Sequence, residues 1–108
     1  MEKHILVVAL NCSDPAKEGE FNEWYNTIHL PDVLETPGFV RATRWQHTDP
    51  KEGDAKFLAL YDIETEDIQA TMKAMGENLT KKREQGRMSD LSSRVLMGLY
   101  KQIKTLEG

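Results

Sequence analysis

The order of strand-like and helix-like apolar patterns along the chain limits its possible folds more than any other feature. Four runs rich in aliphatic, aromatic and β-branched residues indicate strands, at 4–11, 39–48, 55–63 and 94–103. Two stripes with helical spacing lie between them: Phe21, Trp24, Tyr25 and Ile28 in the first, and Ile68, Met72, Met75 and Leu79 in the second. The order βαββαβ predicts a split βαβ unit, with an antiparallel four-stranded sheet of order 4-1-3-2 and both helices on one face.

The residues that border these segments are of the kinds that start and stop helices and strands. Asp14 and Pro15 are typical of a helix N-cap and first turn, and Gly86 is a candidate stop for the second helix. The sequence TPG at 36–38 ends the first helical stretch, and DPKEGD at 49–54 joins the second and third strands as a hairpin. We therefore expect the chain, 1–108, to form a single α+β domain.

The first, third and last strand-like runs are apolar at both odd and even positions, so both faces of the sheet should be apolar. Two helices can cover only one of these faces. The other would expose a large apolar patch, which normally marks an interface. The sequence therefore predicts a homodimer that packs sheet against sheet about a two-fold axis. The second run carries Arg41, Arg44 and His47, which suits a sheet edge or the mouth of a cavity.

The charge and the cysteine content exclude several classes of partner. The chain has 14 basic and 18 acidic residues, a net charge of −4 and no long block of like charge, so neither nucleic acid nor a membrane surface is expected. Cys12 is the only cysteine, which indicates a reducing, cytoplasmic setting, and no segment resembles a membrane span or an export signal. His4 and His47 lack spaced partner ligands, so no metal site is predicted.

A histidine stands where the first helix is expected to break. Tyr25 and His29 are four residues apart and so share a helical face. Pro31 cannot donate a backbone hydrogen bond to the carbonyl of Thr27, so the helix should kink directly after His29 and open a cleft. The helix dipole favours a protonated imidazole and burial favours a neutral one. If the two effects cancel, the pKa of His29 stays near about 6.5 and the ring can exchange protons near neutral pH.

An alternative interpretation gives these residues structural roles. Pro31 could begin a short second helix, with Asp32 and Glu35 near its positive end. His29 would then be a hydrogen-bonded structural residue, and Tyr25 would be a core residue with its hydroxyl at the surface.

The stretch 20–39 resembles the first helix of small EthD-like proteins in the dimeric α+β barrel superfamily, which has a ferredoxin-like fold. The matching positions are Phe21, Trp24, Tyr25, His29, Pro31, Leu34, Pro37, Gly38 and Phe39. The superfamily includes cofactor-free polyketide cyclases, decarboxylases, lactone isomerases, quinol-forming monooxygenases and haem-degrading enzymes. The resemblance implies a pocket between helices and sheet in each subunit, where a histidine or tyrosine handles protons.

The sequence and the resemblance together suggest a small cofactor-independent enzyme that acts on an aromatic, polyketide-like or lactone substrate as a cyclase, decarboxylase or isomerase. In this hypothesis His29 moves the proton and Tyr25 stabilises a developing oxyanion. The expected substrate-binding residues are Trp24, Phe21, Phe39, Asn11 and Arg44. No cofactor is required. One alternative is a cofactor-free or haem-using monooxygenase of the same fold. Another is a non-catalytic dimer that binds an apolar ligand or serves as an accessory protein.

Overall fold

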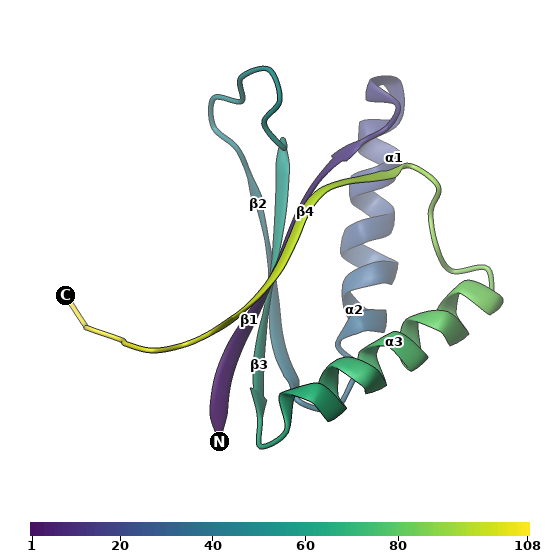
Figure 1. Ribbon diagram of the computed structural model, residues 1–108. Coiled ribbons are helices and arrows are strands. Elements are labelled where there is room, and N and C mark those ends of the chain that lie inside the picture. Colours follow the sequence, from purple (N-terminus) through teal and green to yellow (C-terminus); the bar gives the residue numbers. More distant parts are fainter.

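Four antiparallel strands form one sheet in the computed structural model, which describes residues 1–108. The strands are β1 (Glu2–Cys12), β2 (Phe39–Gln46), β3 (Phe57–Thr65) and β4 (Ser92–Lys101). Their order across the sheet is β2-β3-β1-β4, which confirms the order and the α+β class predicted from the sequence. Figure 1 shows the sheet nearly edge-on, with every helix on one side and the C-terminal segment running away on the other.

The first helical stretch contains three kinds of helix. Its parts are a 3₁₀ turn (Pro15–Lys17), α1 (Glu18–Trp24), a π-helical turn that we call the π-turn (Tyr25–His29), and α2 (Leu30–Val33). Asp14 caps its start, as predicted, because the Asp14 carboxylate accepts a hydrogen bond of 3.0 Å from the amide of Ala16.

The chain does not kink directly after His29, so that prediction is wrong. Leu30 keeps helical φ and ψ angles of −59° and −49°, and its amide bonds to the carbonyl of Tyr25, five residues back. Such a bond takes up one extra residue in the helix without breaking it. Pro31 then lies in the first turn of α2, where a missing amide hydrogen is tolerated. The structure thus matches the alternative in which Pro31 begins a short second helix.

The second helix, α3 (Ile68–Glu84), is capped at both ends. The carboxylate of Asp67 accepts a hydrogen bond of 3.1 Å from the amide of Ala70. Gly86, the expected stop, follows the helix with a φ of +74°, the left-handed conformation that glycine adopts most easily at helix ends. No helix of the chain combines the length and the apolar character needed to cross a lipid bilayer.

The hydrophobic core lies between the helices and one face of the sheet. Pairing of β1 with β3 places Leu6 opposite Tyr61 and Leu10 opposite Phe57, and all four side chains are buried. Phe21 of α1 is fully buried against this face, with its ring 6.2 Å from the ring of Phe57. Apolar side chains of α3 pack against the same cluster. This inner face therefore positions both helical stretches.

The outer face of the sheet is apolar and has no helix over it. Trp45, Leu96 and Tyr100 belong to this face, and 55%, 55% and 53% of their surfaces are exposed. Leu58 and Leu60 of β3 lie beside them and are half-buried. The two-sided apolar pattern seen in the sequence is thus reproduced in the sheet, with one face covered and one open.

Candidate active site between the helices and the sheet

A cavity of about 340 Å³ lies between the π-turn, α3, the loop that joins α3 to β4 (residues 85–91) and the inner face of the sheet. Ten of its 15 lining residues are hydrophobic. The lining residues are Leu6, Val8, Trp24, Tyr25, His29, Val33, Tyr61, Met75, Leu79, Arg83, Met88, Ser89, Ser92, Arg94 and Met97. An apolar cavity with a few polar groups is the usual form of a small-molecule site.

A second hollow of the same volume lies near one end of the sheet, where charged side chains dominate its lining. Only three of its ten lining residues are hydrophobic, and Arg41 and Asp62 form an ion pair of 2.8 Å within it. Its charges are thus partly neutralised by one another. The apolar cavity beside His29 is therefore the stronger candidate for a substrate site.

The π-turn stacks the imidazole of His29 on the indole of Trp24. The two ring centres are 4.9 Å apart and the planes differ by 23°. Residues five apart on an α-helix point about 140° away from each other, so an α-helix would separate these side chains. The π-turn instead brings residues five apart onto one side. Tyr25 meets the same imidazole edge-on, with ring centres 4.8 Å apart.

His29 is a neutral imidazole at pH 7. Burial lowers its pKa from 6.5 to about 4, the nearby Asp32 carboxylate opposes this shift, and Arg44 adds to it. The expectation that the pKa would stay near neutrality is therefore wrong, because loss of water around the ring outweighs the favourable charges. Neither ring nitrogen makes a hydrogen bond within the chain, and both remain accessible from the cavity. The ring can thus accept a proton or a hydrogen bond from a molecule in the cavity.

Tyr25 and Tyr61 form a buried pair of phenols beside the imidazole. Their hydroxyl oxygens are 3.1 Å apart, and both residues line the cavity. Burial raises the pKa of both hydroxyls, so both stay protonated at neutral pH. Only one of the two O–H groups is used in their mutual hydrogen bond. The other O–H remains able to donate to a bound oxygen.

The other four candidate residues from the sequence do not line this cavity. Phe21 is fully buried in the core, and Phe39 is buried with its ring 6.0 Å from that of Tyr61. The side-chain oxygen of Asn11 accepts a hydrogen bond of 2.7 Å from the amide of Lys56, which ties β1 to the end of the β2–β3 hairpin. These three residues support the fold around the cavity.

Arg44 packs behind the aromatic cluster. Its guanidinium carbon lies 4.3 Å from the centre of the Tyr25 ring, and its Nη1 donates to the side-chain oxygens of Asn22 and Asn26 at 2.9 and 3.1 Å. Burial lowers the pKa of Arg44. Its nearby positive charge makes the Tyr25 hydroxyl more acidic than burial alone would leave it. Arg44 thus affects the cavity through Tyr25.

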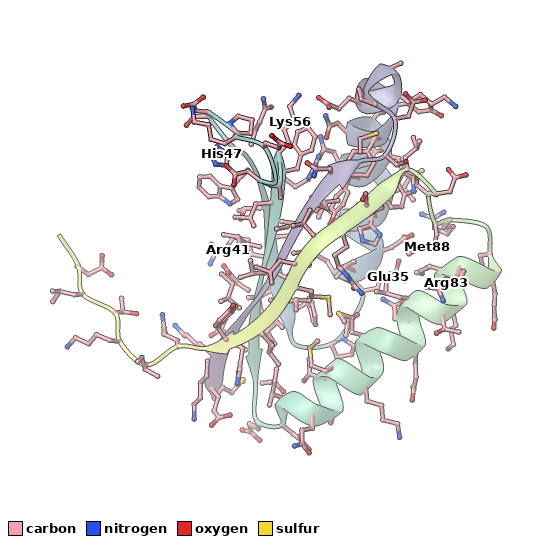
Figure 2. The ribbon with its side chains drawn as sticks, turned by 45° about the horizontal axis from the view of Figure 1, so that its top comes forward. Glu35, Arg41, His47, Lys56, Arg83 and Met88 are labelled. Carbon is pink, nitrogen blue, oxygen red and sulfur yellow. The ribbon has the colours of Figure 1, made fainter.

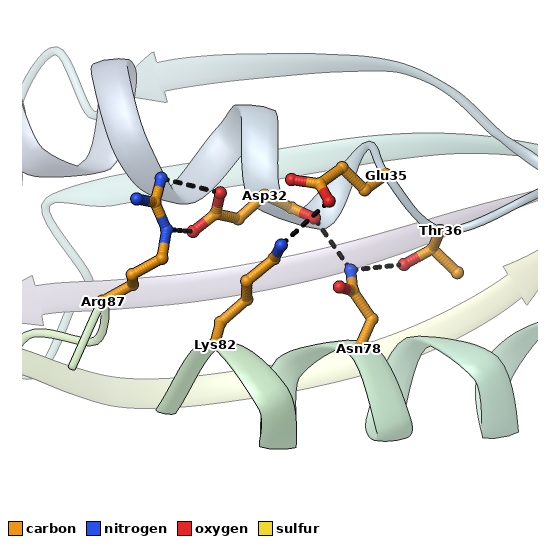
Figure 3. Close-up of polar contacts among 6 residues, drawn as sticks. All are labelled: Asp32, Glu35, Thr36, Asn78, Lys82 and Arg87. Atoms are coloured by element: carbon orange, nitrogen blue, oxygen red, sulfur yellow. Dashed lines mark hydrogen bonds and ion pairs between the residues drawn. The ribbon is translucent and has the colours of Figure 1, made fainter. Parts of the chain in front are cut away.

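An ion pair between the buried Asp32 and the exposed Arg87, which the sequence did not reveal, fixes the loop that covers the cavity (Figure 3). Asp32 is only 3% exposed and accepts two hydrogen bonds from Arg87, of 2.8 and 3.0 Å. The hydrogen bonds and charge of Arg87 lower the pKa of Asp32. The indole Nε1 of Trp24 donates to the backbone carbonyl of Arg87 at 2.9 Å. The indole that stacks on His29 is thus held by the loop.

Two further contacts join α3 to the end of the first helical stretch (Figure 3). The Asn78 amide donates to the backbone carbonyl of Asp32 at 2.8 Å and to the hydroxyl of Thr36 at 3.1 Å. Lys82 and Glu35 form an ion pair of 2.8 Å. No group of three histidine, cysteine, aspartate or glutamate side chains is placed to hold a metal ion.

No protein-family model matches this sequence, and no curated protein matches it. Solved structures do resemble it. A variant of SnoaB, a cofactor-independent oxygenase from Streptomyces nogalater, matches with a TM-score of 0.65 and 19% identity over 100% of both chains. The haem-degrader MhuD from Mycobacterium tuberculosis, with two haems bound in its active site, matches with a TM-score of 0.65 and 11% identity over 96% of this chain and 99% of its own.

A dimeric ferredoxin-like protein from an uncultured marine organism matches with a TM-score of 0.67 and 6% identity, over 98% of this chain and 100% of its own. At such low identities these likenesses show a shared fold. The chain therefore has a ferredoxin-like α+β fold, as the sequence resemblance implied. The narrower likeness to EthD-like proteins stays a prediction.

Proposed function

We propose that this protein is a small cofactor-independent enzyme in which His29 takes a proton from an aromatic or enolisable substrate bound in the cavity. The observation that carries the proposal is a neutral imidazole on the wall of an apolar cavity, with no hydrogen bond from either ring nitrogen to another group of the chain. A general base must be unprotonated at the working pH and within reach of the substrate. His29 meets the first condition, and its place in the cavity lining supports the second.

The low pKa of His29 determines which substrates are suitable. A phenol has a pKa of about 10, so transfer of its proton to an imidazole of pKa about 4 costs about 8 kcal/mol before other interactions. The products are an imidazolium and an oxyanion in contact, whose attraction is strong in an apolar cavity. The free O–H of the Tyr25–Tyr61 pair can donate to the same oxyanion. Substrates with more acidic enols or phenols are therefore favoured.

Proton removal is the first step of several reactions. Cyclisation, decarboxylation and isomerisation, which the sequence resemblance suggested, can all begin from the resulting anion. Oxygenation has additional support, because the SnoaB neighbour is described as a cofactor-independent oxygenase. In an oxygenation of this kind a CH₂ group and O₂ give a C=O group and H₂O, with no other reductant. We favour this reaction for the present site.

Oxygen uptake tests the proposal. With anthrone, which enolises to a phenol and carries a CH₂ group, the wild-type protein should consume one O₂ for each ketone formed. His29→Ala should lower the rate by about 10²- to 10⁴-fold, the usual contribution of one proton-transfer group. His47→Ala removes an exposed histidine of the hairpin and is the matched control. Equal rates for wild-type protein and His29→Ala would exclude His29 from the mechanism and favour a non-catalytic binding protein.

Haem is the cofactor that the MhuD likeness raises. The free nitrogens of His29 are compatible with an iron ligand, so adding haemin is an informative control. A Soret band that needs His29 would replace the cofactor-independent proposal with a haem-using one. An unchanged haemin spectrum, with oxygen uptake intact, would support the proposal made here.

We also propose that two copies pack through the outer faces of their sheets. The half-exposed side chains of Trp45, Leu96 and Tyr100 form the apolar surface that such a dimer would bury. The marine neighbour is described as dimeric. Sedimentation at micromolar concentration should give a dimer, and Leu96→Lys should give a monomer, because the lysine would be buried without a partner. A well-folded wild-type monomer at that concentration would contradict the burial argument.

A further inference from the structure

The charged residues of the cavity all carry the same sign. Arg83 and Arg94 line it, and no aspartate or glutamate does. His29 is neutral there. This is a local excess of positive charge in a chain whose net charge is −4. A cavity with this charge favours an anion over a neutral molecule of the same shape.

The two arginines have no acidic partner within the chain. No carboxylate lies within ion-pair distance of either guanidinium. The Nη1 of Arg94 donates a hydrogen bond of 3.2 Å to the sulfur of Met97, a weak acceptor. Neighbouring cations differ in this respect, because Lys82 pairs with Glu35 and Arg87 pairs with Asp32. Arg83 and Arg94 are thus free to bind a ligand in the cavity.

The two guanidinium groups come from different walls. Arg83 lies near the C-terminal end of α3, followed by Met88 in the loop, as Figure 2 shows, and Arg94 lies on β4. The stacked rings of Trp24 and His29 form another part of the lining. A ligand that fits has a flat apolar body and one planar anionic group, because guanidinium pairs with carboxylate in a matching planar geometry.

We propose that the cavity selects an aromatic carboxylate, with its rings beside Trp24 and His29 and its carboxylate held by Arg83 and Arg94. This inference rests on the proposed function only in taking the cavity as the substrate site. It adds the chemical class of the substrate and the residues that recognise it. The hydroxyls of Ser89 and Ser92, which also line the cavity, are further donors for the same group.

A pair of stable probes tests the inference without any turnover. Anthraquinone-2-carboxylate and its methyl ester share one ring system and differ in charge, and their binding can be followed by quenching of tryptophan fluorescence or by calorimetry. The acid should bind wild-type protein at least about tenfold more tightly than the ester at low salt, and added salt should reduce this difference.

Single variants then assign the effect to residues. Arg83→Gln and Arg94→Gln should each weaken binding of the acid by about threefold to tenfold and leave the ester unchanged. Lys81→Gln removes a positive charge from an exposed position of α3 that does not line the cavity, and should change neither ligand. Equal binding of acid and ester, equal losses for both ligands in the arginine variants, or no saturable binding of the acid would overturn the inference.

The outcomes separate this inference from the proposed reaction. Charge-selective binding without any oxygen uptake would keep the aromatic carboxylate and reject the oxygenase. Oxygen uptake that depends on His29, together with equal binding of acid and ester, would keep the enzyme and reject the roles of Arg83 and Arg94.

Discussion

Replacement of His29 by glutamine should remove a pH dependence of stability that the buried imidazole causes. In the folded protein the pKa of His29 is about 4, against 6.5 for an unperturbed histidine. Between these two values the unfolded chain binds a proton that the folded chain does not, so the free energy of unfolding falls as the pH falls. Integrated from pH 7 to pH 5, this single group accounts for about 2 kcal/mol.

Urea unfolding followed by circular dichroism at pH 7, 6 and 5 measures this effect. Wild-type protein should lose about 2 kcal/mol more than His29→Gln over this range, a difference of roughly 1 M in the urea midpoint. The protein concentration must be fixed, because dimer dissociation would also change the midpoint. His47→Gln, on an exposed side chain, is the control. If wild-type protein and His29→Gln respond equally to pH, the ring is hydrated and the burial argument fails.

Three further predictions concern stability and the loop. Tyr61→Phe leaves the buried Tyr25 hydroxyl without its partner and should cost about 1 kcal/mol in urea unfolding; no loss would mean that the hydroxyl finds another partner. Gly38 has a φ of +97°, which alanine adopts only with strain, so Gly38→Ala should destabilise the protein by about 1–2 kcal/mol. Gly76 lies in the exposed middle of α3, where alanine is the better helix former, so Gly76→Ala should stabilise the protein by about 1 kcal/mol. Arg87→Met removes the ion-pair partner of Asp32, so it should lower Tm and shift the fluorescence of Trp24 to the red. An unchanged spectrum would show that the loop does not hold the indole.

The fold was largely predictable because its elements are encoded by local patterns. Asp14 and Gly86 mark helix ends by side-chain and backbone chemistry that acts within a few residues. The two-sided apolar strands predicted a second apolar sheet face that the helices do not cover, and the structure contains it. The π-turn was not predictable in this way, because Pro31 is compatible with either a kink or a new helix start, and the structure has the new helix start.

The site was predictable only in part. Helical spacing correctly grouped Tyr25 with His29, and both line the cavity. It would have separated Trp24 from His29, and the π-turn is what stacks these two side chains. Tyr61 and Arg94 come from strands that are distant in sequence, and only the sheet register shows that they reach the same cavity. The alternation of Phe57, Ala59 and Tyr61 could have placed Tyr61 on the inner face. The pKa of His29 depends on how completely water is removed, a property of the packed structure that spacing alone does not reveal.

The π-turn also affects how this site can be traced in distant relatives. Its extra residue is a one-residue insertion inside a helix, and a chain without it would turn every later side chain by about 100° about the helix axis. An ungapped alignment through 25–29 would then equate His29 with a residue that points elsewhere. Functional equivalents should therefore be sought by superposition, as the imidazole that stacks on the tryptophan, with an offset of one position allowed.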